Sequence, residues 1–455
     1  MTSREIPHAD ARATAAALDL SKRDLTLDLA RVFCVLLVVV IHLLMVGVGR
    51  SPDGALVVSR PLEEQPWFDA ATWVGQIMPL FFVVGGFASL TAWRSTLRRG
   101  GGAADYVRNR VLRLAQPAFP LFVFYVAVIG GATLVGVDPQ LLDTVVLGAG
   151  APLWFIAAYA LCQAVVPLMA GLHARAPRAT LATLAGGVVV VDAARYAADV
   201  PQIGYLNLLL VWPLVQQIGF WYADGWFARR RWFTLALIAA ACFAALAPLT
   251  LLGPYDTDML TNLNPPTLPL VLLGLAQACL LRLLRPALHR LMETHAARAV
   301  VFVVGTRLMT IYLWHLPLII ILSGVALLVP GASPEPATPA WWWSRIVAYL
   351  IVLGALFALS LLVGRWEAPR EVGPTPPGFV VGVAAALTIT PTFLVIEYFL
   401  DLWLAILGAV FLGAAILLLG RWPDQNPKSP PKSPKSEPKS ASVPASEASA
   451  ADASA

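Results

Sequence analysis

Charged residues are scarce in this sequence. Only 13% of its 455 residues are Asp, Glu, Lys or Arg, while 58% are hydrophobic, and a soluble domain usually carries about 25% charged residues. This scarcity excludes an ordinary water-soluble fold and predicts a protein whose apolar segments pack as one bundle in a lipid bilayer. The formal net charge of +5 is modest. We therefore expect no nucleic-acid partner, because most basic residues serve to orient the chain in the membrane.

Cysteine is also rare. The four cysteines, at positions 34, 162, 242 and 279, lie within apolar runs and share no CxxC or Cys–His spacing. This argues against disulfides and against a metal site. No small-residue cleavage site follows the first apolar run, so we expect the first helix to stay in the mature protein. The two halves show no internal duplication of the kind that marks many transporters.

Twelve apolar runs are long enough for membrane helices. They lie near residues 29–49, 70–93, 117–136, 152–171, 180–198, 204–223, 233–252, 267–284, 304–329, 342–364, 377–396 and 400–420. We predict an all-α, polytopic transmembrane bundle with about ten core helices in 29–364 and two additional helices in 365–421. The last two are nearly contiguous, which also fits a bent or re-entrant pair. Residues 1–28 are predicted to be a cytoplasmic segment, and the Pro-, Lys- and Ser-rich residues 422–455 a disordered cytoplasmic tail.

Arginines are concentrated in alternate gaps between the apolar runs. Counted from the N-terminus, the even-numbered gaps hold 17 arginines, whereas the odd-numbered gaps hold only Arg50, Arg60, Arg195 and Arg345. Cytoplasmic loops of membrane proteins are enriched in Lys and Arg. The pattern predicts a multi-pass protein of the cell membrane with both termini in the cytoplasm.

Two ionisable residues stand out in the first apolar run. Arg31 and His42 are eleven residues apart, so on an α-helix they share one face at a separation of about 16 Å. His42 can serve as a general base or a proton relay, or as a buried ring that is hydrogen-bonded between helices. Arg31 can equally be an orienting charge at the end of a span. Asp28, three residues before Arg31, can orient its guanidinium.

Two further pairs are candidates. Tyr312 and His315 are three residues apart and share a helix face, where a structural hydrogen bond explains them nearly as well as a site does. Arg110 and Arg113 lie in the segment 108–117, which we interpret as a basic loop that enters a helix at its final proline. Such a loop can cradle an anionic cofactor, or it can merely follow the positive-inside rule.

Polar residues are also expected near the outer surface. Asp192 and Asn207 lie there, and Asn264 precedes the eighth apolar run. Their side chains suit the binding of a hydroxylated acceptor. They can equally cap loops.

These residues, in this order, resemble the acyltransferase-3 family of integral membrane acyltransferases. The resemblance runs from about residue 28 to about residue 363 and rests on Arg31 with His42, on Phe81-Phe82-Val-Val-Gly85-Gly86-Phe87, on Arg110-Val-Leu-Arg113-Leu, and on Tyr312-Leu-Trp-His315. Three further segments resemble those of an actinobacterial-type branch without a fused hydrolase-like domain: Leu153-Trp154-Phe155 with Tyr159, Gln217-Ile-Gly219-Phe220 with Asp224-Gly225, and Asn264-Pro265-Pro266-Thr267. Members commonly carry a serine where this chain has Gly85. The family moves acyl groups, commonly acetyl from acetyl-CoA, onto sugars of surface polysaccharides, lipid-linked glycans or small secreted molecules.

The resemblance implies a mechanism for this chain. Arg31, Arg110 and Arg113 are expected to bind the phosphates of an acyl-CoA donor, and His42 to act as base or acyl relay towards the acceptor hydroxyl. Tyr312, His315 and Asn264 are expected in the acceptor pocket, with no metal and no permanently bound cofactor. Two alternatives remain: a twelve-helix proton-coupled transporter or exporter that uses His42 and His315 as relay groups, and a catalytically idle scaffold.

Overall fold

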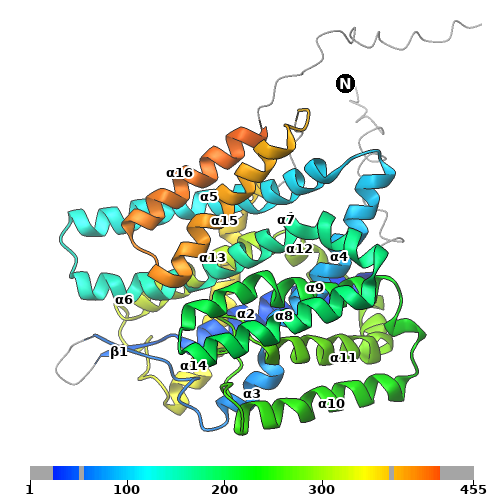
Figure 1. The fold of residues 1–455 in the computed structure, drawn as a ribbon. Helices are drawn as coiled ribbons and strands as arrows, with labels where there is room; N and C mark the ends of the chain where they lie inside the picture. The colour runs from blue at the N-terminus through cyan, green and yellow to red at the C-terminus, as the bar shows by residue number, and fades with distance from the viewer. Residues whose placement is uncertain (1–23, 51–55, 368–372, 421–455) are drawn as a thin grey trace, which may run out of the picture. The chain divides into compact units, whose positions relative to one another are not determined.

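The structure is a computed structural model that describes residues 24–50, 56–367 and 373–420. Most of the predicted segment 1–28, and the predicted tail 422–455, lie outside the described residues. The regular secondary structure of the described chain is helical apart from one antiparallel pair of short strands, β1 (Gly47–Arg50) and β2 (Leu56–Ser59). The α-helices, many of them labelled in Figure 1, are α2 (Leu25–Met45), α3 (Phe68–Gly75), α4 (Met78–Arg98), α5 (Ala103–Leu134), α6 (Pro139–Gly150), α7 (Trp154–Arg175), α8 (Pro177–Ala198), α9 (Val211–Ala223), α10 (Trp232–Leu251), α11 (Leu268–Glu293), α12 (His295–Gly305), α13 (Leu308–Ala326), α14 (Pro339–Val363), α15 (Gly378–Tyr398) and α16 (Leu402–Gly420). Four short 3-10 helices join them: η2 (Ala151–Leu153), η3 (Pro201–Leu209), η4 (Phe227–Arg229) and η5 (Gly364–Trp366).

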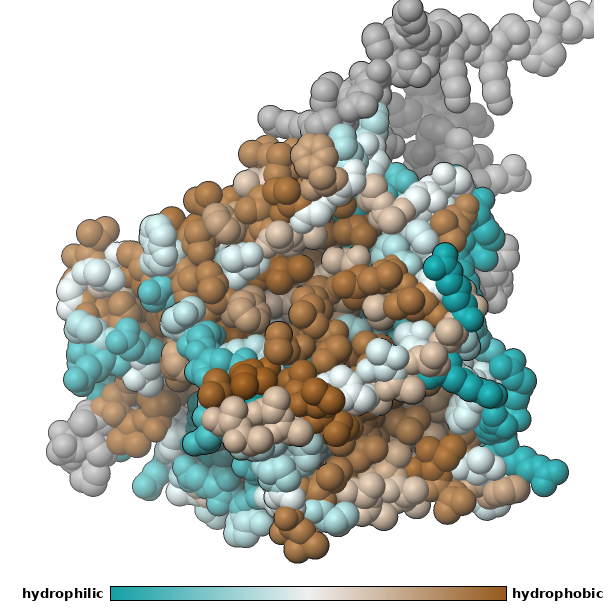
Figure 2. All heavy atoms as spheres, viewed as in Figure 1, coloured by the Kyte–Doolittle hydropathy of each residue, from teal (hydrophilic) through white to brown (hydrophobic). Residues whose placement is uncertain are grey.

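The prediction of an all-α polytopic bundle is confirmed. The described residues contain twelve helical segments that are long and apolar enough to cross a membrane. Figure 2 shows a broad hydrophobic band across one face, with hydrophilic side chains gathered towards its two sides. This is the surface that a bilayer requires, because lipid covers the apolar middle and water the polar ends.

The two ends of the bundle differ in charge. One end carries the ion pairs Arg94–Asp224 (2.7 Å) and Arg285–Asp24 (3.4 Å), and we name it the arginine-rich end. At the other, the loop end, residues 252–267 pack against α3, where the Trp73 indole donates to the carbonyl oxygen of Thr257 (2.8 Å). The two ion pairs thus join α4 to the residue after α9, and α11 to the residue before α2, and both arginines come from even-numbered gaps.

The prediction of a loop over residues 108–117 is wrong. These residues lie inside α5, which begins at Ala103 and includes Pro117. The start is set by Asp105, whose carboxylate accepts a hydrogen bond from the Gly102 backbone N–H (2.7 Å), a typical cap of a first helical turn. Proline is tolerated inside membrane helices because neighbouring groups satisfy the freed carbonyl, so Pro117 did not mark a helix start.

The last two spans are separate helices joined by residues 399–401. The Asp401 carboxylate caps the start of α16 by accepting from the Leu404 N–H (2.7 Å). Both helices pack into the bundle, α16 against α5 and α15 against α7. Arg108, which is 2% exposed, holds the far end of α16 because its Nε and Nη2 donate to the Leu419 carbonyl oxygen at 2.9 and 2.7 Å.

Small residues let α4 and α9 touch along their backbones. A Cβ atom on Gly86 would lie 2.2 Å from the Gln216 carbonyl oxygen, and one on Gly219 only 2.0 Å from that of Val83. Close approach of this kind is what small residues provide in membrane bundles. It brings Phe82 into stacked contact with Trp212, with ring centroids 4.2 Å apart.

Candidate active site

Two predicted site residues from distant spans meet inside the bundle. His42 on α2 and His315 on α13 lie with ring centroids 4.9 Å apart, and His315 Nε2 is 3.1 Å from His42 Nδ1. His315 is 0% exposed, whereas His42 keeps part of its surface accessible. The sequence placed each histidine in a helix, and the packing of α2 against α13 joins them.

The hydrogen bonds of the pair assign its protons. His42 Nδ1 is 3.0 Å from the Val38 carbonyl oxygen, and His315 Nδ1 is 2.5 Å from that of Tyr312. A carbonyl oxygen only accepts, so each Nδ1 carries a proton, and each Nε2 of the neutral rings carries a lone pair. His315 Nε2 can then accept from the His42 Nδ1–H. The Nε2 of His42 keeps its lone pair, and the hydrogen bonds at Nδ1 fix the orientation of the ring.

Tyr312 lies beside this pair but its hydroxyl is engaged. It donates to the Pro152 carbonyl oxygen (3.0 Å), and its ring packs on Phe155 with centroids 4.6 Å apart. The geometry favours a structural role for Tyr312 and a positioning role for His315. Their predicted contact with an acceptor stays a prediction.

Arg31 lies on the same continuous helix as His42, towards the arginine-rich end. The unbroken helix α2 separates the two residues by about 16 Å along its axis, as the spacing predicts. Within the described residues, the buried Nε of Arg31 has no hydrogen-bond partner. No ion pair found there joins Arg31 to Asp28, so the structure does not show the expected orienting contact. A buried donor that lacks a partner is unusual, and an anionic group could accept its hydrogen bond.

Arg110 and Arg113 lie on α5, away from α2. The guanidinium of Arg110 sits over the ring of Tyr106 at 5.2 Å, and the Tyr106 hydroxyl donates to the Gln163 side-chain oxygen (2.9 Å). Arg113 is exposed. A donor site shared by the three arginines stays a prediction.

Gly85 lies against the side chain of Tyr159. A Cβ atom there would lie 3.2 Å from the Tyr159 ring and 3.5 Å from its hydroxyl oxygen. A side chain at this position would therefore require the Tyr159 ring to shift by a few tenths of an ångström.

The polar residues expected near the outer surface come together only in part. At the loop end, Asp192 accepts from the Asn207 side chain (2.7 Å), the Tyr255 hydroxyl (2.9 Å) and the Leu268 N–H (3.1 Å). Burial, followed by the negative charge of Asp192, raises the pKa of Tyr255. Asn264 is exposed nearby in the chain, and in the described residues no hydrogen bond links it to either histidine.

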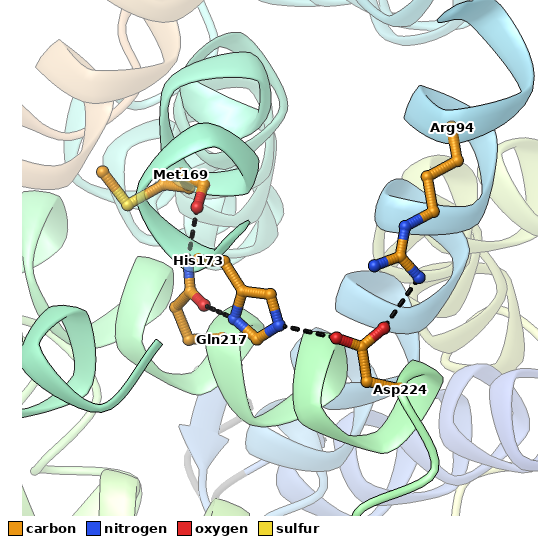
Figure 3. A network of polar contacts seen from close by, with 5 residues as sticks. All are labelled: Arg94, Met169, His173, Gln217 and Asp224. Atoms are coloured by element: carbon orange, nitrogen blue, oxygen red, sulfur yellow. Dashed lines mark hydrogen bonds and ion pairs between the residues drawn. The ribbon is translucent and has the colours of Figure 1, made fainter. Parts of the chain in front are cut away.

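One polar network escaped the sequence reasoning. Figure 3 shows His173 of α7 between Gln217 and Asp224, with Arg94 on the far side of Asp224. His173 is 4% exposed; its Nδ1 lies 2.8 Å from the Gln217 side-chain oxygen and its Nε2 3.0 Å from Asp224. Because Gln217 donates its NH₂ to the Met169 carbonyl (3.1 Å), both ring nitrogens of His173 face acceptor oxygens. Gln217 and Asp224 belong to a segment that carries the family resemblance, but the sequence did not connect them to His173 or Arg94.

This network also perturbs its carboxylate. Burial of Asp224 opposes ionisation, but the hydrogen bonds and charges of Arg94 and His173 outweigh it and lower the pKa of Asp224. The network thereby ties α4, α7 and α9 together at the arginine-rich end.

The comparison with known protein families agrees with this architecture. A family model described as an acyltransferase domain, Acyl_transf_3, matches residues 24–365. The chain belongs to the acyltransferase-3 family. It is therefore a membrane acyltransferase, and the match spans both His42 and His315. Searches of curated proteins and of solved structures returned no match. Within the described residues, no group of three or more His, Cys, Asp or Glu side chains is arranged to hold a metal ion.

Proposed function

We propose that this acyltransferase moves an acyl group, commonly acetyl, from acyl-CoA to a hydroxyl of a glycan, a lipid-linked sugar or a secreted small molecule. In this proposal the protein lies in the cell membrane with its arginine-rich end and both termini in the cytoplasm, where acyl-CoA is available. Support comes from the family match, from the arginine asymmetry, and above all from the His42–His315 pair, which leaves His42 Nε2 as an oriented base.

The chemistry follows from that pair. His42 Nε2 takes the proton of the acceptor hydroxyl as its oxygen attacks the thioester carbonyl. The C–O bond forms, the C–S bond breaks, and the CoA thiolate leaves and recovers the proton. The His42 Nδ1–H stays bonded to the Val38 carbonyl and to His315 Nε2, so the ring keeps its orientation while it carries the proton. His315 acts as a positioning residue.

Arg31 supplies the donor contact in this proposal. Its guanidinium lies at the arginine-rich end of α2 and its Nε lacks a partner in the described chain, so it can pair with a phosphate of CoA. The pantetheine arm then extends along α2 towards His42. Arg110 and Arg113 remain further candidates for the donor phosphates, and Asn264 for the acceptor.

The decisive experiment is transfer of label from radioactive acetyl-CoA by the purified protein in detergent or proteoliposomes. We expect His42→Ala to lower the transfer rate by about 10²- to 10⁴-fold, the usual worth of a general base, while the exposed-residue control His295→Ala leaves it unchanged. Equal transfer by the wild type and His42→Ala would contradict the assignment. Label that is never transferred or hydrolysed by the wild type would favour the scaffold or the proton-coupled transporter.

The acceptor can be identified in cells. Deletion of the gene should remove acyl groups from one class of glycan or secreted metabolite, as read by mass spectrometry. Complementation with the wild type, but not with His42→Ala, should restore them.

A further inference from the structure

A groove opens at the arginine-rich end, apart from the histidine pair. It has a volume of about 620 Å³ and lies where the turn between α7 and α8 meets the connection from α9 through η4 to α10. Its walls include two tryptophans and three arginines: Trp221, Trp226, Arg178, Arg229 and Arg230. A cavity of this size accommodates a small molecule or a headgroup.

The charge of the groove is one-sided. Arg178, Arg229 and Arg230 are all exposed, and none of them forms an ion pair within the described chain, where Asp224 pairs with Arg94 and Asp24 with Arg285. The guanidinium of Arg230 is held over the Trp226 ring at 4.6 Å. Uncompensated guanidinium groups set around one hollow are suited to a phosphate, which they can bind through paired hydrogen bonds.

Backbone groups add to this preference. Helix α8 begins in the groove at Pro177, and no side chain caps its first turn. The free N–H groups and the positive end of the helix dipole favour an anion at that place. Behind the groove, Trp221 packs against the ring of His173 with centroids 6.1 Å apart.

The groove lies beside a surface that faces membrane lipid. The neighbouring spans α8 and α10 are peripheral, with only 22% and 28% of their apolar windows buried in the protein. Directly after the groove arginines, α10 presents Trp232 (73% exposed) and Leu237 (69% exposed). Figure 2 shows this change along the same face, from hydrophilic side chains at the right-hand edge, where α8 and α10 begin, to the hydrophobic band. The face thus presents arginines, then a tryptophan, then apolar side chains. A membrane leaflet has the matching order, with lipid phosphates at its surface, then the interfacial region, then the hydrocarbon chains.

We propose that this groove binds the phosphate of an anionic phospholipid in the adjoining leaflet, with the acyl chains along the exposed apolar surface of α10. The site is separate from the proposed acyl-transfer chemistry. Since the groove is lined by the α7–α8 turn with the start of α8, by Trp221 of α9 and by the connection through η4, an occupied site joins these segments at one end of the bundle.

The test measures lipid binding to the intact, detergent-purified protein by native mass spectrometry and thermal unfolding. Phosphatidylglycerol should bind and raise the unfolding temperature more than phosphatidylcholine does. Replacing Arg178, Arg229 and Arg230 together by Gln should weaken phosphatidylglycerol binding about tenfold or more, because several charge-assisted hydrogen bonds are lost. The single variant Arg229→Gln should give a smaller loss in the same direction.

A matched control separates a site from general attraction. The triple variant of Arg98, Arg99 and Arg290 to Gln removes the same charge from exposed positions outside the groove, and it should bind phosphatidylglycerol like the wild type. Equal losses in both triple variants, or no loss in the groove variant, would overturn the proposal. So would inorganic phosphate or free CoA that displaces the lipid at micromolar concentration, because the groove would then serve a soluble phosphoryl ligand.

Discussion

The contact between α4 and α9 provides a sharp test of the packing. Gly219→Ala adds a single methyl group at a point where its Cβ would lie 2.0 Å from the Val83 carbonyl oxygen, 2.8 Å from the Phe87 nitrogen and 2.9 Å from the Gly86 Cα. All three neighbours are backbone atoms, so no side-chain rotation can relieve the overlap. Normal contact distances require the two helices to separate by roughly 1 Å or more.

The size of the effect follows from two opposing contributions. Overpacking a tight interface costs about 1 to 3 kcal/mol, and a rigid backbone contact belongs at or above the upper limit. Alanine in place of glycine in a helix returns about 1 kcal/mol. The free energy of unfolding should therefore fall by about 2 kcal/mol. Separation also weakens the stacking of Phe82 on Trp212.

Thermal unfolding in detergent is the assay, and Gly186→Ala in α8 is the matched control. Gly186 is also a helical glycine, but nothing lies within 4 Å of its would-be Cβ, so this variant should be as stable as the wild type or slightly more stable. If Gly219→Ala unfolds at the same temperature as Gly186→Ala, the direct backbone contact between α4 and α9 does not exist as described.

Three further predictions concern the polar groups. Arg108→Met should lower the unfolding temperature by several degrees and expose the end of α16 to protease, because the Leu419 carbonyl loses both of its guanidinium donors. The pKa of Asp224 is lowered in the folded protein, so its ionised form stabilises the fold above the unfolded-state pKa of about 3.9 and ceases to do so as the pH falls through the folded value. The stability difference between the wild type and Asp224→Asn should thus shrink below about pH 4 in unfolding scans, and a constant difference would contradict the ion-pair network. His315→Ala should lower kcat and change its pH dependence with little effect on KM for acyl-CoA, whereas an equal rise in KM would contradict a purely positioning role.

The sequence predicted which segments are helical better than it predicted the residue at which each helix begins. Apolar length alone gives the twelve spans, because a bilayer demands about 20 apolar residues per helix. The start of α5 was wrong because Pro117 was taken as a boundary, whereas the glycines and Asp105 just upstream set it. Proline restricts a helix in water far more than in a membrane bundle.

One part of the candidate site follows from the geometry of a single helix, and the other part depends on contacts between helices. Arg31 and His42 share a face by helix geometry alone, and the structure keeps that relation. The environment of Gly85 depends on Tyr159, which lies two spans later in the chain. The network of His173, Asp224 and Arg94 joins three helices, and residues so far apart in sequence leave no spacing that could reveal it.

The sequence by itself therefore determined the all-α bundle in a membrane, the number of spans, the clustering of arginines at alternate gaps, and the resemblance to the acyltransferases. These depend on local quantities, namely segment length, charge and residue spacing along one helix. Only the tertiary structure decided that His42 meets His315, that Arg108 holds the end of α16, and that three arginines surround one groove. Such contacts depend on which helices pack together, and helix packing is set by the fit of side chains across the whole bundle.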